Sequence, residues 1–577
     1  MKKFSADFET ATWLTDETYV WAWALCNIDD ENDLRIGNSI ESFFEEIQKE
    51  NCTLWFHNLK FDGEFILYYL LKNGYERIEN KKDRKDKTFM TLISDMGLFY
   101  SMEIYFKVGN KSCKKVTIYD SLKILPFSVD VIAKTFGLPI RKLELDYDTP
   151  REKGYVLKDY EKDYITNDVK IVALALKEMF DENLTKMTIG SNALSNYKES
   201  KGVLTFSRLF PSLNRELYED LKNAYKGGFT YLNPIYKEVE NGSTVILDVN
   251  SLYPSVMTGE YLPFGDPIYF IGKYEEDPLY KLYIQTLTCS FELKEGKIPT
   301  IQIKNNLAFV PNEYVKSSDG DLVTLTLTNV DLKLFFENYD VKNITYHSGW
   351  KFKALKGLFT NYISYWTEKK INAKKEGNNV LYLISKLMLN SLYGKFGLNP
   401  NVGSKFPYLN EEGVVKYGNY PMEIRDSVYL PVATFVTSLA RRKTILTSQA
   451  IKDYTLKNYG KDYYIYSDTD SIHLLDMEEE KLKSFVEIDD YKLGAWKLES
   501  KFKKGKYIRQ KCYIEEGYDD KLNVVIAGLP KKLGNIINFD NFKVGFTTEN
   551  MDIKEKKLTF KHVKGGVLLV NTDFTIK

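Results

Sequence analysis

The chain has 577 residues with 80 basic and 80 acidic side chains, so its formal net charge at pH 7 is zero. This length predicts about three to five domains, and 44% hydrophobic with 28% charged residues is typical of a soluble globular protein. No run of about 18 uncharged apolar residues appears, which argues against a transmembrane helix, and the early acid in MKKFSADFET argues against a signal peptide.

Cysteines, histidines and the distribution of charge narrow the class of protein further. The five cysteines form no CxxC pair and the four histidines are dispersed, so we expect no zinc site and reduced thiols in a cytoplasm. Residues 497–511 carry seven basic side chains against a single acid, Glu499, whereas residues 1–50 are strongly acidic. A neutral chain with a basic second half is typical of a protein that binds phosphate on one face. A solvated lysine surface is the alternative.

Strand-like and helix-like runs alternate over residues 1–185, which predicts a mixed α/β domain. A Gly/Ser/Asn-rich stretch at 189–202 indicates a domain boundary. Residues 244–255, TVILDVNSLYPS, are typical of a buried strand that runs into a turn. Residues 258–357 are short β-like runs interrupted by Pro and Gly.

The second half of the chain begins with a helical segment at 358–396, in which Gly377-Asn378-Asn379 is predicted to connect two helices. A β-like piece follows at 397–428, strands and helices resume to about residue 528, and the chain ends in short strands. The sequence contains neither an internal repeat nor a low-complexity segment.

Two aspartates that are far apart in the sequence lie at the tips of apolar strands. Asp248 ends VILDV, and Asp470 lies in the turn of YIYSDTDSIHLL. Buried like charges cost several kcal/mol unless something positive offsets them. Acids in this arrangement suit divalent cations, and two ions about 4 Å apart could activate a 3′-hydroxyl and stabilise pyrophosphate. The alternative is that both are ordinary turn aspartates.

A second group of acids lies upstream. Asp7 and Glu9 are two residues apart on a predicted strand and therefore point to one face. Asp62 follows another strand, and Tyr164 and Asp168 are four residues apart on a helix. Four acids and a tyrosine could bind two metals and direct a water at a phosphodiester. Taken singly, each acid could instead be surface charge.

The predicted helix KLMLNSLYGKFG places three polar or aromatic residues on one face. Lys386, Asn390 and Tyr393 occupy positions i, i+4 and i+7. Such a face could hold a triphosphate and press against a nascent base pair, whereas its leucines suit an ordinary amphipathic core helix.

These motifs resemble those of known enzymes. DVNSLYPS, KLMLNSLYGKFG and YSDTDS resemble, in order, the palm, fingers and palm motifs of family B DNA polymerases, and the upstream acids resemble the DEDDy 3′–5′ exonucleases. Over nearly its whole length the chain resembles the protein-primed DNA polymerases of small linear-genome Bacillus phages, the phi-twenty-nine type. The supporting segments are FHNLKFDGEF, IYDSLKILPF, AYKGGFTYLN, FDNFKVGF and GGVLLVNTDFTIK.

The resemblance implies an α/β and α+β multidomain fold, with an N-terminal RNase H-like 3′–5′ exonuclease domain and a right-hand polymerase carrying two insertions. The first insertion would contact the terminal protein, and the second would support strand displacement and processivity. The implied bounds are 1–188 for the exonuclease, 189–257 and 429–530 for the palm, 258–357 for the first insertion, 358–396 for the fingers, 397–428 for the second insertion and 531–577 for the thumb.

For the palm, the resemblance implies that Asp248 and Asp470 are the principal metal ligands and that Asp468 supports them. The backbone of Val249 would help to place the metal-bound triphosphate. Tyr253 would stack under the incoming sugar and exclude a 2′-hydroxyl, so that deoxynucleotides are preferred.

For the fingers and the DNA, the resemblance implies that Lys386 holds the triphosphate while Asn390 and Tyr393 line the nascent pair. Lys511 and Tyr513 resemble a KxY motif that steadies the primer end. Thr437 and Arg441 resemble a template-contacting motif, and Tyr225, Gly227 and Gly228 resemble the motif between domains that balances synthesis against editing.

For the exonuclease, the four upstream acids would hold metal, Tyr164 would orient the water and Lys142 would support catalysis. Aromatic stacking suits single-stranded DNA, at about 1–3 kcal/mol per base. The residues that would grip the frayed strand are Thr10, His57, Asn58, Phe61, Phe65, Ser121, Leu122, Phe127 and Tyr147.

The implied activity is replication of a linear phage genome by protein priming, with processive strand displacement and proofreading. The implied cofactor is Mg²⁺, two ions per active site, with Mn²⁺ as a substitute. The implied partners are template and primer DNA, dNTPs and a terminal protein, but no membrane. We expect a monomer, or a heterodimer with the terminal protein, in the cytoplasm of the infected bacterial host.

Two alternatives stay open, an oligonucleotide-primed family B polymerase and a non-catalytic single-stranded-DNA-binding protein. The chain also departs from the family pattern. Its fingers hairpin is longer, so Lys370, Lys374 and Lys375 have no one-to-one match, and Tyr382 lies where the family has a lysine.

Overall fold

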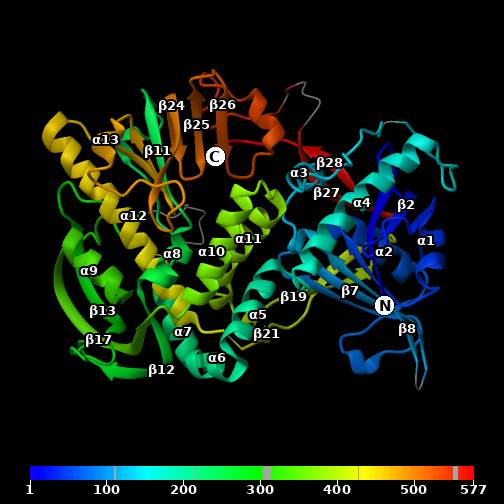
Figure 1. Cartoon of the computed structure of the whole chain (residues 1–577), viewed down its shortest axis with the longest axis horizontal. Helices are drawn as coiled ribbons and strands as arrows, with labels where there is room; N and C mark the ends of the chain where they lie inside the picture. Colours follow the sequence, from blue (N-terminus) through cyan, green and yellow to red (C-terminus); the bar gives the residue numbers. More distant parts are fainter. Residues whose placement is uncertain are drawn as a thin grey trace.

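The structure is a computed structural model that describes residues 1–109, 112–147, 149–213, 215–302, 314–426, 428–549, 551 and 556–577. Part of the predicted first insertion, residues 303–313, therefore lies outside the described residues. Two large sheets, surrounded by helices, form separate halves of the molecule (Figure 1). This arrangement confirms the predicted multidomain fold of mixed α/β and α+β character.

The N-terminal half is built on a ten-stranded sheet, here called the N-terminal sheet. Its interior strand β1 (Lys2–Thr10) pairs antiparallel with β2 (Val20–Asn27) and parallel with β4 (Cys52–Phe56). Alternation along β1 buries Phe4, Ala6 and Phe8 against α2 (Leu59–Lys72) on one face. The other elements of this half are β3 (Leu34–Gly37), α1 (Ile40–Ile47), β5 (Glu76–Arg77), β6 (Thr88–Ser94), β7 (Phe99–Val108), β8 (Cys113–Asp120), α3 (Val129–Thr135) and α4 (Asp159–Asp181).

The other half is built on an eight-stranded sheet, here called the central sheet. Strand β11 (Thr244–Val249) lies between β23 (Ser471–Leu475) and β24 (Trp496–Arg509). Helices α8 (Leu252–Gly259) and α12 (Leu430–Tyr459) pack beside it. The remaining elements here are β9 (Thr230–Leu232), β10 (Glu240–Asn241), β22 (Tyr464–Asp468), α13 (Glu479–Leu482), β25 (Cys512–Gly517) and β26 (Leu522–Ile526).

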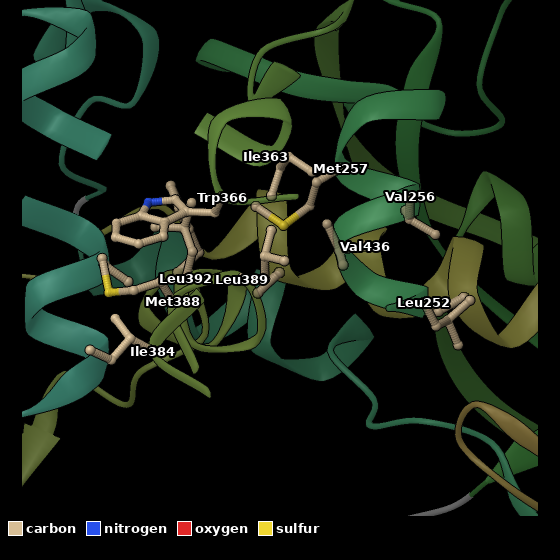
Figure 2. Packing of buried hydrophobic residues seen from close by; sticks show 14 of the residues in the cluster. Leu252, Val256, Met257, Ile363, Trp366, Ile384, Met388, Leu389, Leu392 and Val436 are labelled. Atoms are coloured by element: carbon tan, nitrogen blue, oxygen red, sulfur yellow. The ribbon is translucent and has the colours of Figure 1, made fainter. Parts of the chain in front are cut away.

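The predicted pair of helices is confirmed as α10 (Thr360–Lys375) and α11 (Asn379–Phe396). Gly377 has a positive φ of 70°, and the Asn378 side chain caps α11 by accepting from the Leu381 N–H. Figure 2 shows side chains of α8, α10, α11 and α12 converging in one core, namely Leu252, Val256, Met257, Ile363, Trp366, Ile384, Met388, Leu389, Leu392 and Val436. Helices α5 (Ile189–Lys201), α6 (Val203–Leu209) and α7 (Arg215–Ala224) lie near this hairpin.

Residues 258–357 form a four-stranded sheet, as far as the structure describes them. Its long strands β13 (Leu282–Leu293) and β17 (Tyr339–Lys356) pair in the middle, and helix α9 (Asn329–Asn338) precedes β17. The sheet is completed by β12 (Tyr261–Ile271) and β16 (Val323–Thr328), and β14 (Ile301–Gln302) pairs separately with β15 (Tyr314–Val315).

Two segments that are distant in sequence dock on the N-terminal half. Strand β19 (Ser404–Leu409) pairs with β6, so the predicted second insertion extends the N-terminal sheet. The C-terminal hairpin β27 (Lys557–Val563) and β28 (Gly566–Thr572) lies against α2, and the Thr18 N–H donates to the Lys564 carbonyl at 2.8 Å. The short strands β18 (Asn401–Val402), β20 (Val415–Asn419) and β21 (Glu423–Ile424) complete the second insertion.

None of the helices in the described ranges is both long and apolar enough to cross a bilayer.

Candidate active sites

The two predicted polymerase acids lie beside each other in the central sheet. Asp248 pairs across the strands with Ser471, the residue after Asp470, and the Val249 N–H donates to the Asp470 carbonyl at 2.8 Å. Directly opposed residues of antiparallel strands have Cα atoms about 4.5–5.5 Å apart. The strand register therefore brings together two acids that the sequence separates widely.

These acids repel each other in a largely buried place. Burial, followed by the charges of Asp470 and Glu499, raises the pKa of Asp248 to about 7. Burial also raises the pKa of Asp470, with Asp468 and Glu499 as neighbouring acids. A divalent cation would relieve this repulsion, and Mg²⁺ binds through a few carboxylates plus substrate phosphates. The donor set therefore fits the metal that the sequence predicts.

Glu499 is a member of this cluster that sequence reasoning missed. The β11–β24 register shifts between Ile246, opposite Ser500, and Leu247, opposite Leu498, which leaves Glu499 as the extra residue of a β-bulge. Bulges next to active sites re-aim side chains. The sequence could have indicated Glu499, because it is the only acid in the basic run. It could not indicate the bulge, which depends on strand pairing.

Asp468 forms an ion pair with a lysine. The Lys511 ammonium lies 2.6 and 2.8 Å from the two Asp468 carboxylate oxygens. The Tyr466 hydroxyl donates to Asp468 at 3.3 Å and accepts from the Lys511 N–H, and the Tyr513 ring lies 5.6 Å from the Tyr466 ring. The predicted primer-steadying pair thus adjoins the turn that carries Asp468 and Asp470. Within the described part of the chain, no three His, Cys, Asp or Glu side chains form a ready metal-binding group.

Several lysines of the basic run 497–511 are ion-paired with neighbouring acids. Lys501 pairs with Asp476, and Lys503 and Lys504 both pair with Glu516. Such exposed pairs contribute at most about 1 kcal/mol each, but they neutralise much of the run. In this conformation the alternative, a solvated and ion-paired lysine surface, describes these three lysines, and phosphate binding by the run stays a prediction.

Gly228 allows its chain segment to approach the turn that carries Asp468 and Asp470. A Cβ at Gly228 would lie 2.6 Å from the Thr469 hydroxyl oxygen, between the two turn aspartates. The Thr469 N–H also donates to the Phe229 carbonyl at 2.7 Å, and Thr469 holds a positive φ of 62°. Gly228 and Phe229, at the end of the YKGG segment, therefore brace the turn that carries Asp468 and Asp470.

We expect Gly228→Ala to lower nucleotide incorporation by about 10- to 100-fold, because the new methyl group must displace Thr469 and with it the neighbouring Asp468 and Asp470. Steady-state primer extension would measure this. Gly242→Ala is a matched control in the same half, because a Cβ there has no neighbour within 4 Å. Equal rates for Gly228→Ala and the parent would show that the close approach has no catalytic importance.

The predicted nucleotide site is formed where α8 faces α11. The rings of Tyr253 and Tyr393 lie 4.1 Å apart, and Lys386 and Asn390 are exposed on the same helix as Tyr393. Burial and the positive charges of Lys386, Lys374 and Lys497 lower the pKa of Lys370. The unmatched Lys370 therefore shares a positively charged region with Lys386.

The upstream acids, from β1, α2 and α4, are close enough to raise one another's pKa values. Glu9, Asp62 and Asp168 are buried, and Asp7 is partly buried. Burial and the charge of Asp168 raise the pKa of Asp7 to about 7, and burial with neighbouring acids also raises the pKa of Glu9 and of Asp62. One carboxylate oxygen each of Asp62 and Asp168 is buried without a hydrogen-bond partner. Buried acceptor oxygens without donors suit a cation.

Lys142 and Tyr164, the residues predicted to support catalysis at this site, lie close to its acids. The Lys142 ammonium donates to an Asp168 carboxylate oxygen, and the hydroxyls of Tyr147 and Tyr164 are 2.6 Å apart. Burial and the charges of Glu9 and Asp168 raise the pKa of Tyr164, which keeps the phenol protonated. A protonated phenol could donate to or position a water.

Most residues predicted to grip single-stranded DNA are engaged within the protein. Both His57 ring nitrogens have partners, the Ser121 hydroxyl at 3.0 Å and the Phe127 carbonyl at 2.7 Å. Phe65 is 1% exposed and is covered by Gly566 of the C-terminal hairpin. Asn58 and Tyr147 are exposed, Phe61, Leu122 and Phe127 are half-buried, and Thr10 and Ser121 are buried.

The predicted template-contacting residues are buried. Thr437 donates within its own helix to the carbonyls of Ala433 and Thr434. Arg441 is 4% exposed and donates to the Asp331 carboxylate, at 2.6 Å for the shorter contact, and to the Gly227 carbonyl at 2.6 Å. Arg441 therefore joins α9 to the Gly227 segment in this conformation, and its contact with template DNA stays a prediction.

The metal-free protein should lose stability as the pH rises. In the folded protein the pKa values of Asp7 and Asp248 are raised to about 7, above the ordinary 3.8. Protonation of these two groups therefore stabilises the fold. This contribution is complete below about pH 4 and is lost as the pH rises through about 7. In EDTA we expect the Tm to fall by at least about 2 °C between about pH 5 and pH 8. Mg²⁺ should restore more at the higher pH, because it no longer competes with protons. A Tm that rises with pH would contradict this.

Comparisons with known proteins agree with this geometry. A family model described as DNA polymerase type B, organellar and viral, matches residues 44–158 and 149–487. The DNA polymerase of Bacillus phage phi29 is 43% identical over 594 residues, covering 100% of this chain and 99% of that protein. That of Streptococcus phage Cp-1 is 34% identical over 607 residues, covering 100% and 98%. The structure of phi29 DNA polymerase complexed with primer-template DNA and incoming nucleotide substrates superposes with a TM-score of 0.92 at 42% identity, covering 100% of both chains.

Proposed function

The chain belongs to the type B DNA polymerases of organelles and viruses, among the phi29-type phage enzymes, and from this premise we propose a protein-primed replicase. It is a DNA polymerase, and it would copy a linear phage genome processively with strand displacement and 3′–5′ proofreading. The observation that supports this most directly is that two separate acid clusters, each with raised pKa values, occur in one chain.

At the palm, Asp248 and Asp470 would bind the metal ions, and the backbone of Val249 would help to place the triphosphate. Two divalent cations, Mg²⁺ in this proposal, would activate the primer 3′-hydroxyl and stabilise the leaving pyrophosphate when bound. Lys386 would attract the triphosphate. Tyr253, packed on Tyr393, would stack under the incoming sugar, and Tyr393 would line the nascent base pair together with Asn390.

Primer binding would require one exchange of partners. Lys511 is ion-paired with Asp468 in the free protein, so it must leave this carboxylate in order to contact the primer backbone. Tyr513 is already fixed by packing on Tyr466 and Tyr507. Primer binding by the KxY pair would then leave the charge of the Asp468 carboxylate without its lysine partner.

At the N-terminal sheet, Asp7, Glu9, Asp62 and Asp168 would hold the metals for excision. Tyr164, held by Tyr147, would orient the attacking water, and Lys142 would offset the negative charge. The single strand would enter past exposed Asn58 and Tyr147, and the contacts proposed for Phe65 require the C-terminal hairpin to shift.

The two insertions support the strand-displacement and priming parts of the proposal. Residues 397–428 join the N-terminal sheet through β19, so this insertion bridges the two halves and could surround DNA. Residues 258–357 would contact a terminal protein. The domain bounds given above are proposed on the same basis, as are a monomer or terminal-protein heterodimer and the host cytoplasm as the site of action.

A primed single-stranded circle with dNTPs and Mg²⁺ tests the proposal. We expect products longer than one circle without a helicase or clamp, and transfer of dAMP to the cognate terminal protein. Products limited to one circle would rule out strand displacement. Extension without transfer to the correct terminal protein would favour an oligonucleotide-primed polymerase, and no extension would overturn the polymerase activity itself.

A further inference from the structure

Lys497 is a basic side chain at the palm site for which the proposed mechanism has no use. It lies directly opposite Asp248 across strands β24 and β11, and opposed residues present their side chains on the same face of a sheet. Its ammonium is 3.8 Å from an Asp248 carboxylate oxygen and 3.5 Å from a Glu499 carboxylate oxygen, and its side chain is 32% exposed.

The contacts of Lys497 are electrostatic and loose. Both distances exceed those of a charge-assisted hydrogen bond, about 2.7–2.9 Å, whereas Lys511 holds Asp468 at 2.6 Å. Among the described residues, the Lys497 ammonium makes these two ion pairs and no side-chain hydrogen bond. An ammonium group held only by Coulomb attraction between two carboxylates can move away without breaking a directed bond.

A second group of charges shows where this ammonium could go. Lys497, Lys386 and Lys374 all act on Lys370, whose own ammonium is 3.4 Å from the Ser251 hydroxyl next to the nucleotide site. Lys497 therefore contacts acids that would bind metal and is also within electrostatic range of Lys370, one of the lysines near the proposed triphosphate site.

We propose that Lys497 is a positioning residue that acts as the resident counter-ion of Asp248 and Glu499, and that it exchanges these carboxylates for nucleotide phosphate when metal and nucleotide arrive. This inference rests on the proposed two-metal polymerase function. While no cation is bound, Lys497 offsets the repulsion among Asp248, Asp470 and Glu499. When nucleotide binds, the same ammonium lies close enough to contact the triphosphate.

The test measures binding rather than turnover. In an Asp7→Ala/Asp62→Ala background, which removes the second metal site, Mn²⁺ binding is followed by electron paramagnetic resonance without nucleotide. Removing a competing ammonium about 4 Å away should tighten Mn²⁺ binding at the palm about three- to tenfold in Lys497→Met. The same variant should bind dNTP, measured with primer-template DNA and Ca²⁺, about three- to tenfold more weakly.

Lys501→Met is the matched control, because Lys501 lies on the same strand and pairs with Asp476 away from these acids. It should change neither affinity, and thermal melts should show that all variants fold. Unchanged or weaker Mn²⁺ binding in Lys497→Met, or unchanged dNTP binding, would overturn the inference. A separate result would contradict the proposed function itself. If Asp248→Ala left the Mn²⁺ binding of the parent unchanged, the palm metal site would be wrong, and the inference with it.

Discussion

Asp248→Ala should lower nucleotide incorporation by about 10⁴-fold or more, while excision of single-stranded DNA stays within about twofold of the parent. The expected loss is large because the proposed mechanism has Asp248 and Asp470 binding the metal ions together, so removing one ligand would remove the site on which both depend. Excision should be spared because the acids proposed for it lie in the N-terminal half, on β1, α2 and α4. Primer extension and release of label from a single-stranded oligonucleotide would measure the two activities, and Asp470→Ala should give the same pattern.

Asp476→Ala is the matched control for these variants. Asp476 directly follows strand β23, which Ser471 begins beside Asp470, but its exposed carboxylate pairs with Lys501. Its removal should leave both activities unchanged. If Asp248→Ala abolished excision as well as synthesis in a folded protein, the separation into two sites would be contradicted.

The elements that carry the site could be predicted because their patterns are local. The apolar run before Asp248, the polar turn at Asp470 and the helical spacing of Lys386, Asn390 and Tyr393 each concern fewer than about a dozen neighbouring residues. Side-chain periodicity and turn chemistry determine such patterns, and the structure has the corresponding strand, turn and helix.

The partners of these residues could not be predicted, because they depend on pairing between distant segments. The bulge at Glu499 arises from a register shift between β11 and β24. Arg441 resembles part of a template-contacting motif, yet it is hydrogen-bonded to Asp331 and Gly227. Phe65 looks like an exposed stacking ring until the C-terminal hairpin covers it. In each case the decisive contact joins residues that only the tertiary fold brings together.

The joining of the second insertion to the N-terminal sheet is a contact of the same kind. The sequence at 397–428 predicts β-structure, but the pairing of Ser404 with Ser94 depends on the free edge of β6. This pairing links the two halves, so the distance between the two sites is fixed partly by backbone hydrogen bonds. A primer end must cross that distance to be edited.

Asp7→Ala combined with Asp62→Ala should lower excision by about 10⁴-fold or more and leave incorporation within about twofold of the parent. Both carboxylates are candidate metal ligands, and the buried Asp62 oxygen without a donor has no evident structural partner to lose. The variant should also melt at a higher temperature than the parent in EDTA near about pH 8, because two repelling, desolvated charges are gone.

Asp181→Ala provides the comparison, since Asp181 ends the helix that carries Asp168 but pairs with Lys177 in solvent. It should change neither activity nor the EDTA melting temperature. Excision that survives the double substitution would remove the four acids from the proposed mechanism. A lower melting temperature in EDTA would mean that these acids stabilise the fold through contacts with other groups, and that their raised pKa values do not reflect mutual repulsion.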